Sequence, residues 1–222
     1  MTRETFDRLL ELLPSLTAPA VVEGGFLDDF QDGLFEAEKF LVASAVDKRR
    51  REFTAGRCAA RKAMQTLGIP PCVIMRGANG EPLWPEGIVG SLSHSESLCF
   101  ALCAKKEKIR AAGIDTERIG RMERNLWRIV FSEDDQGAIE AMPDKAMAAT
   151  VAFSAKEAFF KAQYSISNRM LEFKSMRVNF ESPGEITIYR DSNDMSFAAV
   201  PQANQLRYLA IDDHVVVTCI IF

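Results

Sequence analysis

The chain has 222 residues, of which 47% are hydrophobic and 26% are charged, and its formal net charge is −4 at pH 7. This length suffices for one large or two small hydrophobic cores, and the composition is that of an ordinary globular protein, which excludes a disordered or fibrous chain. A general nucleic-acid-binding protein normally carries an excess of basic residues. We therefore expect no nucleic-acid partner.

The N-terminal segment and the cysteines predict a cytoplasmic chain without a membrane span. Residues 1–13 mix charges of both signs with leucines at helical spacing, which is typical of an amphipathic helix and not of a secretory signal. The longest apolar runs, 98–104 and 215–222, are too short to cross a bilayer. The five cysteines include no Cys-x-x-Cys pair and cannot all form disulfides within one chain.

Hydrophobic periodicity predicts helices and strands in chain order. Two long helices are expected, at residues 44–67 and 144–164, and the first carries a polar stripe of arginines beside an apolar stripe. Strand-like runs lie at residues 72–76, 88–92, 98–104, 111–114 and, in several pieces, 176–222. The expected breaks are a hairpin-type turn at 77–80, a charged loop at 117–128 and turns at 182–184 and 191–194.

The two predicted helices carry an internal repeat. Residues 53–61 (FTAGRCAAR) align with residues 153–161 (FSAKEAFFK), which places Arg57 opposite Glu157. A Gly-Glu pair at a strand start follows each helix. The repeat favours a duplicated fold, and the alternative is a chance likeness between two alanine-rich helices.

Three carboxylates and one lysine are expected to meet. Asp115 and Glu117 alternate at the end of an apolar run, so on a strand both side chains point to one face, about 7 Å apart along the chain. Glu157 and Lys161 stand four residues apart and share one helical face. These groups can hold Mg2+, with a phosphate on its open side, and Mn2+ accepts the same ligands. Alone, each pair is more typical of a surface ion pair or a turn.

Five motifs between Arg49 and Lys161 resemble, in order and spacing, those of the 4'-phosphopantetheinyl transferases. They are an arginine-bearing helix at 49–61, GEPLWP at 80–85, GSLSHS at 90–95, GIDTE at 113–117 and FSAKEAFFK at 153–161. The likeness is to the large, cytosolic, monomeric type that includes the surfactin and enterobactin enzymes. The first forty residues and the last sixty carry no matching motif.

The resemblance implies an α+β fold of two similar subdomains related by pseudo-twofold symmetry. Each subdomain would consist of a long helix packed on a small, mostly antiparallel sheet. One half would span residues 1–110 and contain the basic helix, and the other would span residues 111–222 and contain the metal ligands and the catalytic helix. Coenzyme A would lie in the cleft between them.

The resemblance also implies Mg2+-dependent transfer of the 4'-phosphopantetheine group from coenzyme A to a serine of an apo acyl, peptidyl or aryl carrier protein, with release of 3',5'-ADP. The implied metal ligands are Asp115, Glu117 and Glu157. The implied catalytic residues are Glu157 and Lys161, and either of these or a water is the base for the serine proton.

The implied coenzyme A contacts are Arg49, Arg57, Arg61, Gly80, Glu81, Pro82, Leu83, Ser93, His94 and Lys161. Arg57 is the first choice for a phosphate, because a planar guanidinium can form paired hydrogen bonds. For each arginine the alternative is a solvated helix face, and Arg49 can instead pair with Glu52. Glu81 departs from the family, since many members have Lys there, and Arg76 is the nearest basic replacement.

Two other functions stay open at the level of the residues. A Mg2+-dependent phosphohydrolase or nuclease would use the same carboxylates, but it leaves the arginine helix and the Ser-His segment without a role. A non-catalytic module would bind a nucleotide or a carrier protein. Incubation with coenzyme A, Mg2+ and an apo carrier protein separates the three functions.

Overall fold

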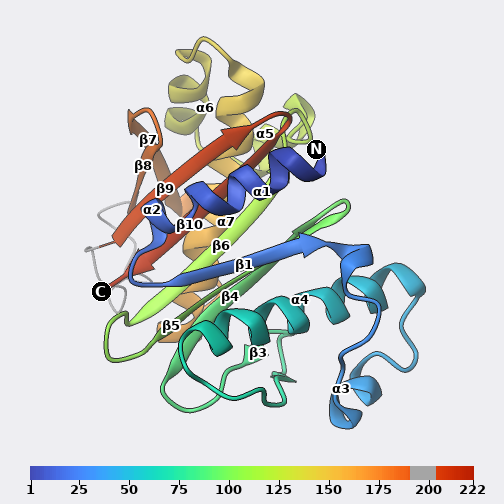
Figure 1. Ribbon diagram of the computed structural model, residues 1–222. Coiled ribbons are helices and arrows are strands. Elements are labelled where there is room, and N and C mark those ends of the chain that lie inside the picture. Colours follow the sequence, from blue (N-terminus) through green and yellow to red (C-terminus); the bar gives the residue numbers. More distant parts are fainter. Residues whose placement is uncertain (191–203) are drawn as a thin grey trace.

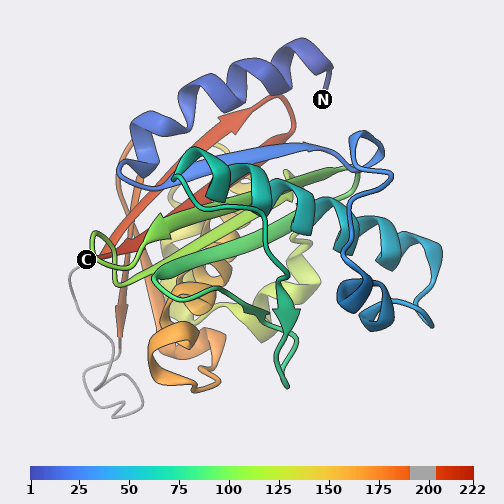
Figure 2. The ribbon, with the colours of Figure 1, turned by 60° about the horizontal axis from the view of Figure 1, so that its bottom comes forward.

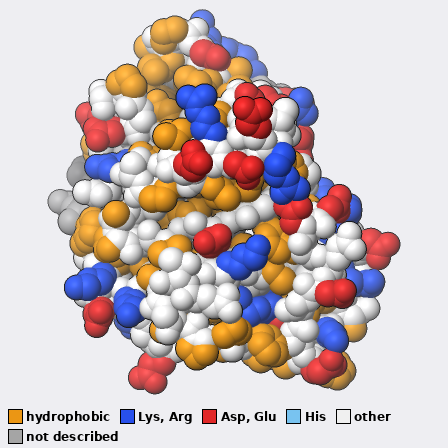
Figure 3. All heavy atoms as spheres, viewed as in Figure 1, with side chains coloured by type: hydrophobic (Ala, Val, Ile, Leu, Met, Phe, Trp, Pro, Cys, Tyr) orange, Lys and Arg blue, Asp and Glu red, His pale blue; other side chains and the backbone are white. Residues whose placement is uncertain are grey.

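A computed structural model describes residues 1–190 and 204–222, and its ribbon contains two antiparallel sheets, each with one long helix (Figure 1). The turn predicted at 191–194 lies outside the described residues. On the face drawn in Figure 3, acidic and basic side chains are interspersed without a large area of one sign. This agrees with the small net charge of the chain.

The first sheet has the strand order β1-β5-β4 and carries the helix α4. Its elements are β1 (Val21–Phe26), α4 (Asp47–Thr66), β4 (Ile88–Ser95) and β5 (Leu98–Lys105). Between α4 and β4 the chain forms a small two-stranded hairpin of β2 (Met75–Arg76) and β3 (Pro82–Leu83). Alanines on α4 and short side chains on β5 allow the helix to lie close to the sheet.

The second sheet has the order β6-β10-β9-β8-β7 and carries the helix α7. Its elements are β6 (Ala111–Arg118), α7 (Lys145–Ser167), β7 (Met176–Ser182), β8 (Glu185–Arg190), β9 (Asn204–Ile211) and β10 (His214–Ile221). All described strand pairs in this sheet are antiparallel.

Shorter helices connect and cover the two sheets. They are α1 (Arg3–Leu12), α2 (Pro14–Thr17), η1 (Leu27–Asp29), α3 (Glu36–Leu41), α5 (Arg124–Val130), α6 (Glu133–Glu140) and η2 (Phe173–Ser175). No helix in the described part of the chain is long and apolar enough to cross a membrane.

The two halves share one topology, which confirms the predicted fold class. The order β1-β5-β4 corresponds to β6-β10-β9, and in each half a long helix follows the first strand of the set. The turn between β5 and β6 spans the proposed boundary at residues 110 and 111, but the division into two domains remains a prediction.

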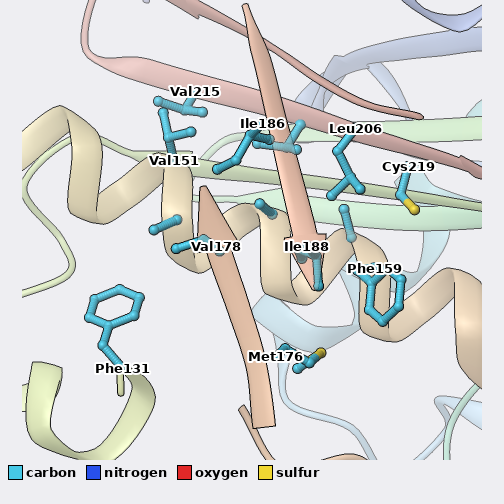
Figure 4. Packing of buried hydrophobic residues seen from close by; sticks show 14 of the residues in the cluster. Phe131, Val151, Phe159, Met176, Val178, Ile186, Ile188, Leu206, Val215 and Cys219 are labelled. Atoms are coloured by element: carbon cyan, nitrogen blue, oxygen red, sulfur yellow. The ribbon is translucent and has the colours of Figure 1, made fainter. Parts of the chain in front are cut away.

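Strand alternation divides the interior into three hydrophobic cores. On β5, Cys99, Ala101 and Cys103 face α4, whereas Phe100 and its even-numbered neighbours face the space between the sheets. On β10 the odd-numbered residues face α7. Figure 4 shows this third core, in which Val215 and Cys219 lie near side chains from α7, β7, β8 and β9. Both sheets therefore contribute to the central core.

The two sheets meet along β4 and β6. Ser93 contacts Asp115 and Ser95 contacts Glu117, so the two strands run in the same direction without a ladder of backbone hydrogen bonds. By the shared topology, the equivalent neighbours would be β9 and β1. There α1 and α2 lie between the sheets, with Phe6 fully buried in the central core (Figures 1 and 2).

The long elements match the sequence-based expectations, and the differences fall on short ones. The strand predicted at 72–76 is reduced to its last two residues, and the loop predicted at 117–128 contains the end of β6 and the start of α5. The sequence prediction missed β1, whose Gly24 and Gly25 obscure the strand pattern. A Cβ at Gly24 would contact the carbonyl oxygen of Cys99, so the glycine permits close strand packing.

Candidate active site

A cavity of about 680 Å³ separates α4 from α7 and has β4 as its floor. One wall comes from α4, through Arg49, Phe53 and Arg57. The opposite wall comes from the C-terminal half of α7 and includes Lys161 and Tyr164. The cavity thus lies between the two halves of the fold, where the family resemblance implied a cleft.

The segment that leads through the hairpin closes one end of this cavity. In Figure 2 the chain between α4 and β4 descends beside the end of α7, and the side-chain amide of Asn79 donates a hydrogen bond to the Tyr164 hydroxyl at 2.6 Å. Gly80, Glu81, Pro82 and Leu83 all line the cavity, and their contact with coenzyme A stays a prediction.

A second cavity, of about 320 Å³, adjoins the first. Its lining contains all three predicted carboxylates and the predicted lysine: Asp115, Glu117, Glu157 and Lys161. Ser93 and His94 line both cavities. The structure therefore brings β4, β6 and α7 together in the way that the motif spacing implied.

Asp115 is buried and has two unlike oxygens. Its Oδ1 accepts hydrogen bonds from Ser93 Oγ at 2.9 Å and from Lys161 Nζ at 2.7 Å. Its Oδ2 is buried and has no hydrogen-bond partner. A buried carboxylate oxygen without a partner is costly, so this atom is suited to receive a cation.

Burial and crowding disfavour the charged forms of the other two carboxylates. Burial, reinforced by the negative charge of Asp115, raises the pKa of Glu117 to about 7. Burial also raises the pKa of Glu157. The positive charge of Lys161 acts to lower this pKa, and the negative charge of Asp115 acts to raise it. A divalent cation would relieve this repulsion, because it favours the deprotonated forms of all three groups.

The donor set fits Mg2+, although the side chains are not arranged as a finished metal site. Carboxylate oxygens are the ligands that this ion prefers, and it usually retains several waters. Among the described residues, no group of three or more His, Cys, Asp or Glu side chains is placed to hold a metal ion. Two observations favour cation binding: the Asp115 Oδ2 atom has no hydrogen-bond partner, and the pKa values of Glu117 and Glu157 are raised.

Lys161 joins the two cavities. Its ammonium donates to Asp115 Oδ1, to the carbonyl oxygen of Ile114 at 3.1 Å and to Ser93 Oγ at 3.3 Å. The side chain is 27% exposed, so a negatively charged ligand can still reach it from the larger cavity. Glu157 and Lys161 share one face of α7, as expected from their spacing.

Ser93 and His94 have different surroundings although both were expected to contact coenzyme A. Ser93 is buried and its hydroxyl also accepts a hydrogen bond from the Thr116 backbone N–H at 3.2 Å. The His94 side chain is 41% exposed, and its Nε2 lies 3.5 Å from a Glu52 oxygen. Burial lowers the pKa of His94. The negative charge of Glu52 acts to raise this pKa, and the positive charge of Arg49 acts to lower it.

Arg57 is buried at the edge of the larger cavity. Its Nε donates to the carbonyl oxygen of Ile74 at 2.8 Å, and its guanidinium lies 4.2 Å from the centre of the Phe53 ring. Burial lowers the pKa of Arg57 to about 10, so the group stays charged at neutral pH. Arg57 therefore presents a desolvated positive charge to the cavity.

The other two arginines differ from this arrangement. Arg49 lines the cavity and lies 3.5 Å from Glu52, so the alternative intrahelical pair is present. Arg61 does not line the cavity, because its guanidinium forms a buried ion pair with Glu38 at 2.8 Å. The expectation that Arg61 contacts coenzyme A directly is not supported by this placement.

Glu81 and Arg76 clarify the departure from the family pattern. The Glu81 carboxylate accepts a hydrogen bond from the Asn79 backbone N–H at 3.0 Å, so an acidic side chain here stabilises the hairpin turn. Arg76 is exposed and is not among the described residues that line the cavity. Its side chain is thus no direct replacement for the missing lysine.

Comparison with known proteins agrees with this geometry. Residues 36–104 match the family model described as the 4'-phosphopantetheinyl transferase N-terminal domain, and residues 111–219 match that of the 4'-phosphopantetheinyl transferase superfamily. The 4'-phosphopantetheinyl transferase Npt of Nocardia iowensis is 34% identical over 165 residues, which are 73% of this chain and 74% of that protein. The chain belongs to the 4'-phosphopantetheinyl transferase superfamily.

This transferase is also similar to other named proteins. The 4'-phosphopantetheinyl transferase Svp of Streptomyces mobaraensis is 36% identical over 169 residues, which are 73% of this chain and 67% of that protein. Enterobactin synthase component D of Salmonella typhimurium is 32% identical over 67% of this chain and 62% of that protein. The holo-[acyl-carrier-protein] synthase of Thermotoga maritima aligns at 18% identity and a TM-score of 0.40, over 50% of this chain and 62% of that one.

The transferase cavity also contains residues that the sequence prediction missed. Tyr164, Phe160 and Met170 line its α7 side, and Trp84 and Ser91 line its β4 side. Helical spacing from Lys161 could have indicated Tyr164 as a neighbour only three residues away. Met170 follows the end of α7, and no local pattern indicates its place in the cavity.

Proposed function

We propose that this chain transfers 4'-phosphopantetheine from coenzyme A to a serine hydroxyl of an apo carrier protein, with Mg2+ as its cation. The single observation that carries the proposal is the continuity of the two cavities. A buried arginine from the first half and three carboxylates from the second half line adjoining spaces. A pyrophosphate ligand needs both kinds of surroundings, positive charge for its oxygens and acidic ligands for its metal ion.

Asp115, Glu117 and Glu157 would hold the cation. Mg2+ supplies charge neutralisation on the pyrophosphate oxygens and orients the reacting phosphorus. Asp115 contributes a buried oxygen without a protein partner, and Ser93 and Lys161 keep its other oxygen in place. The same three carboxylates would accept Mn2+. Replacing Mg2+ by Mn2+ therefore tests which ion the site prefers and does not test the mechanism.

The cationic and polar side of the proposed coenzyme A site consists of Arg57, Lys161, Arg49 and His94. Lys161 is placed to stabilise negative charge on the pyrophosphate, because its ammonium reaches the boundary between the two cavities. Arg57 and Arg49 are available for phosphate oxygens from the α4 side. His94 with a lowered pKa is mostly neutral at pH 7 and would contribute a hydrogen bond and not a full charge.

The reaction is a single displacement at phosphorus. The serine oxygen of the carrier forms a bond to the β-phosphorus, which carries the pantetheine arm, and the bond from this phosphorus to the bridging oxygen of 3',5'-ADP breaks. The serine proton passes to a base. We assign this role to Glu157, because its raised pKa makes its carboxylate a stronger base than an ordinary one. The products are the holo carrier protein and 3',5'-ADP.

The chain would act as a monomer in the cytoplasm, on acyl, peptidyl or aryl carrier proteins. Residues from both halves of the chain, Arg57 of the first and Lys161 of the second, line the larger cavity, and on this basis the proposal needs no second copy. The described cysteines are all free thiols, which suits a reducing compartment.

Mass spectrometry tests the proposal directly. Purified chain is incubated with coenzyme A, Mg2+ and a panel of apo acyl, peptidyl and aryl carrier proteins, with a chelator control for each. The expected result is one added phosphopantetheine mass on at least one carrier and its loss with the chelator. Cleavage of coenzyme A without a modified carrier would indicate a hydrolase, and binding without any product would indicate a non-catalytic module.

A further inference from the structure

A buried acidic side chain outside both cavities connects α3 to the coenzyme A side of the site. Glu38 is 0% exposed, and its Oε1 accepts from the Ile74 backbone N–H at 2.8 Å and from Arg61 at 2.8 Å. Its Oε2 accepts from Arg61 at 3.1 Å and from the Phe35 backbone N–H at 3.0 Å. Both oxygens are therefore fully used by donors.

The backbone of Ile74 is held from two sides. Glu38 accepts its N–H, and Arg57 donates to its carbonyl oxygen at 2.8 Å. Ile74 is fully buried and precedes β2 outside any helix or strand, so it has no ladder of strand hydrogen bonds. Two charged side chains thus replace a neighbouring strand, and they do so one residue before the hairpin.

The same contacts set the position of Arg57. Its guanidinium rests against the Ile74 carbonyl oxygen and the Phe53 ring. Glu38 supplies a negative charge that balances the two neighbouring arginines, Arg57 and Arg61. Without this carboxylate, the buried guanidinium groups of Arg57 and Arg61 would repel each other along one face of α4, and the Ile74 N–H would be unsatisfied.

We infer that Glu38 is a positioning residue for coenzyme A binding, which acts through Ile74 and Arg57 on the hairpin wall of the larger cavity. Arg61 contributes to the same positioning, because it donates hydrogen bonds to both oxygens of the Glu38 carboxylate. Arg61 itself does not line the cavity. The inference rests on the proposed function only in taking coenzyme A as the ligand. Binding of that ligand then depends partly on α3, outside the motifs that resemble the family.

Calorimetric titration of the full chain with coenzyme A is the first measurement. Glu38→Gln keeps the shape but replaces an acceptor oxygen by an N–H2 group that faces donors, so we expect affinity to fall about tenfold. The matched control is Glu36→Gln, because Glu36 lies on the same helix, is 82% exposed and pairs only with its neighbour Lys39 among the contacts described. Its affinity should equal that of the unmodified chain.

Kinetics and hydrogen exchange separate positioning from a general loss of structure. In Glu38→Gln the KM for coenzyme A should rise about tenfold, while kcat and the KM for the carrier protein stay near their original values. The Ile74 amide should lose protection while the amides of β6 and β10 keep theirs. If Glu38→Gln does not fold, Glu38→Asp replaces it, since its shorter side chain cannot reach Ile74 and Arg61 together.

Two results would overturn the inference. One is a folded Glu38 variant with unchanged coenzyme A affinity, and the other is an Ile74 amide that stays protected in that variant. Failure of the unmodified chain to bind coenzyme A would count against the proposed function instead. In that case the exchange of the Ile74 amide would still decide whether Glu38 positions the hairpin.

Discussion

Charge crowding dominates the chemistry of the site at the scale of single residues. Burial disfavours ionisation of Glu117 and Glu157, and Asp115 adds repulsion to both. Lys161 compensates part of this charge through its contact with Asp115 at 2.7 Å. The remaining excess of negative charge favours binding of a divalent cation.

Glu157→Gln should nearly abolish turnover. The substitution preserves the shape of the side chain but removes a charge from the proposed metal shell and a base from the site. We expect kcat to fall by about 10²- to 10⁴-fold, with only partial recovery at high Mg2+ concentration. The measurement is the rate of holo carrier formation against Mg2+ concentration. The control is Glu133→Gln, which changes an exposed glutamate on α6, and near-normal turnover in Glu157→Gln would remove that residue from the mechanism.

The pKa of Glu117 predicts how stability depends on pH when no divalent cation is present. A carboxyl group whose pKa rises from 4.5 to about 7 on folding binds its proton more tightly in the folded chain. Its stabilising contribution is complete below pH 4.5 and is lost as the pH rises through about 7. The unmodified chain should therefore lose free energy of unfolding over this interval relative to Glu117→Gln.

Urea denaturation at several pH values, with a chelator throughout, measures that difference. A parallel dependence in the two proteins would show that Glu117 has no raised pKa. Adding Mg2+ should reduce the loss seen at pH 7 and above, because the ion favours the deprotonated carboxylate.

Close packing of β6 against α7 sets the geometry of the site at the scale of elements. A Cβ at Gly113 would fall within the contact distance of the Ala158 carbonyl group. Gly113 lies two residues before Asp115, and Ala158 follows Glu157, so this contact fixes the separation of two proposed metal ligands. The glycine is required for close approach and not for an unusual backbone angle.

Gly113→Ala should destabilise the fold and also slow turnover. Forcing a methyl group into this contact is expected to cost about 1 to 3 kcal/mol of unfolding free energy. Gly137→Ala is the matched control, because Gly137 lies inside α6 and an added Cβ would meet nothing within 4 Å. That control should gain up to about 1 kcal/mol. Chemical denaturation measures both, and a neutral Gly113→Ala would show that β6 and α7 can separate freely.

The sequence predicted elements whose patterns are long and periodic. The helix predicted at 144–164 corresponds to α7, and the strand predicted at 98–104 corresponds to β5. Local patterns failed where tertiary contacts decide the conformation. Only Trp127 is buried on α5, so its seven residues show no apolar stripe. The two-glycine strand β1 likewise depends on its pairing with β5.

The candidate site shows the same division between local and long-range information. The spacing of Asp115 and Glu117 on a strand, and of Glu157 and Lys161 on a helix, placed each pair on one face, and the family resemblance supported the prediction that the two pairs meet. The fate of Arg61 was not predictable, because its partner Glu38 lies 23 residues away, in a segment without a matched motif. The role of Glu81 in its turn was hidden for a similar reason, since it depends on the hairpin geometry.

The central core governs behaviour at the scale of the whole molecule. Its buried residues come from α1 and from both sheets, and include Phe100 of the first half and Val216 of the second. Neither half can satisfy this core alone, so residues 1–110 and 111–222 should unfold together although they share one topology.

Single-tryptophan variants test this cooperativity. Trp84 reports on the first half and Trp127 on the second, and they are the two tryptophans of the chain. Trp84→Phe and Trp127→Phe each leave one reporter, and the fluorescence transition of each should coincide with the loss of helical circular dichroism of the same variant. Two separated transitions within one variant would instead establish two independently stable domains, as the proposed division at residue 110 would allow.

A duplicated topology offers two equivalent seams between the sheets, and this chain uses them differently. Along β4 and β6 the two strands are in contact and the cavity lies above them, between α4 and α7, whereas α1 and α2 cover the seam between β9 and β1. Phe6 and Leu9 seal it with apolar side chains that leave no room for a phosphate. The proposed transferase site therefore lies on one side of the described part of the molecule, at the seam of β4 and β6.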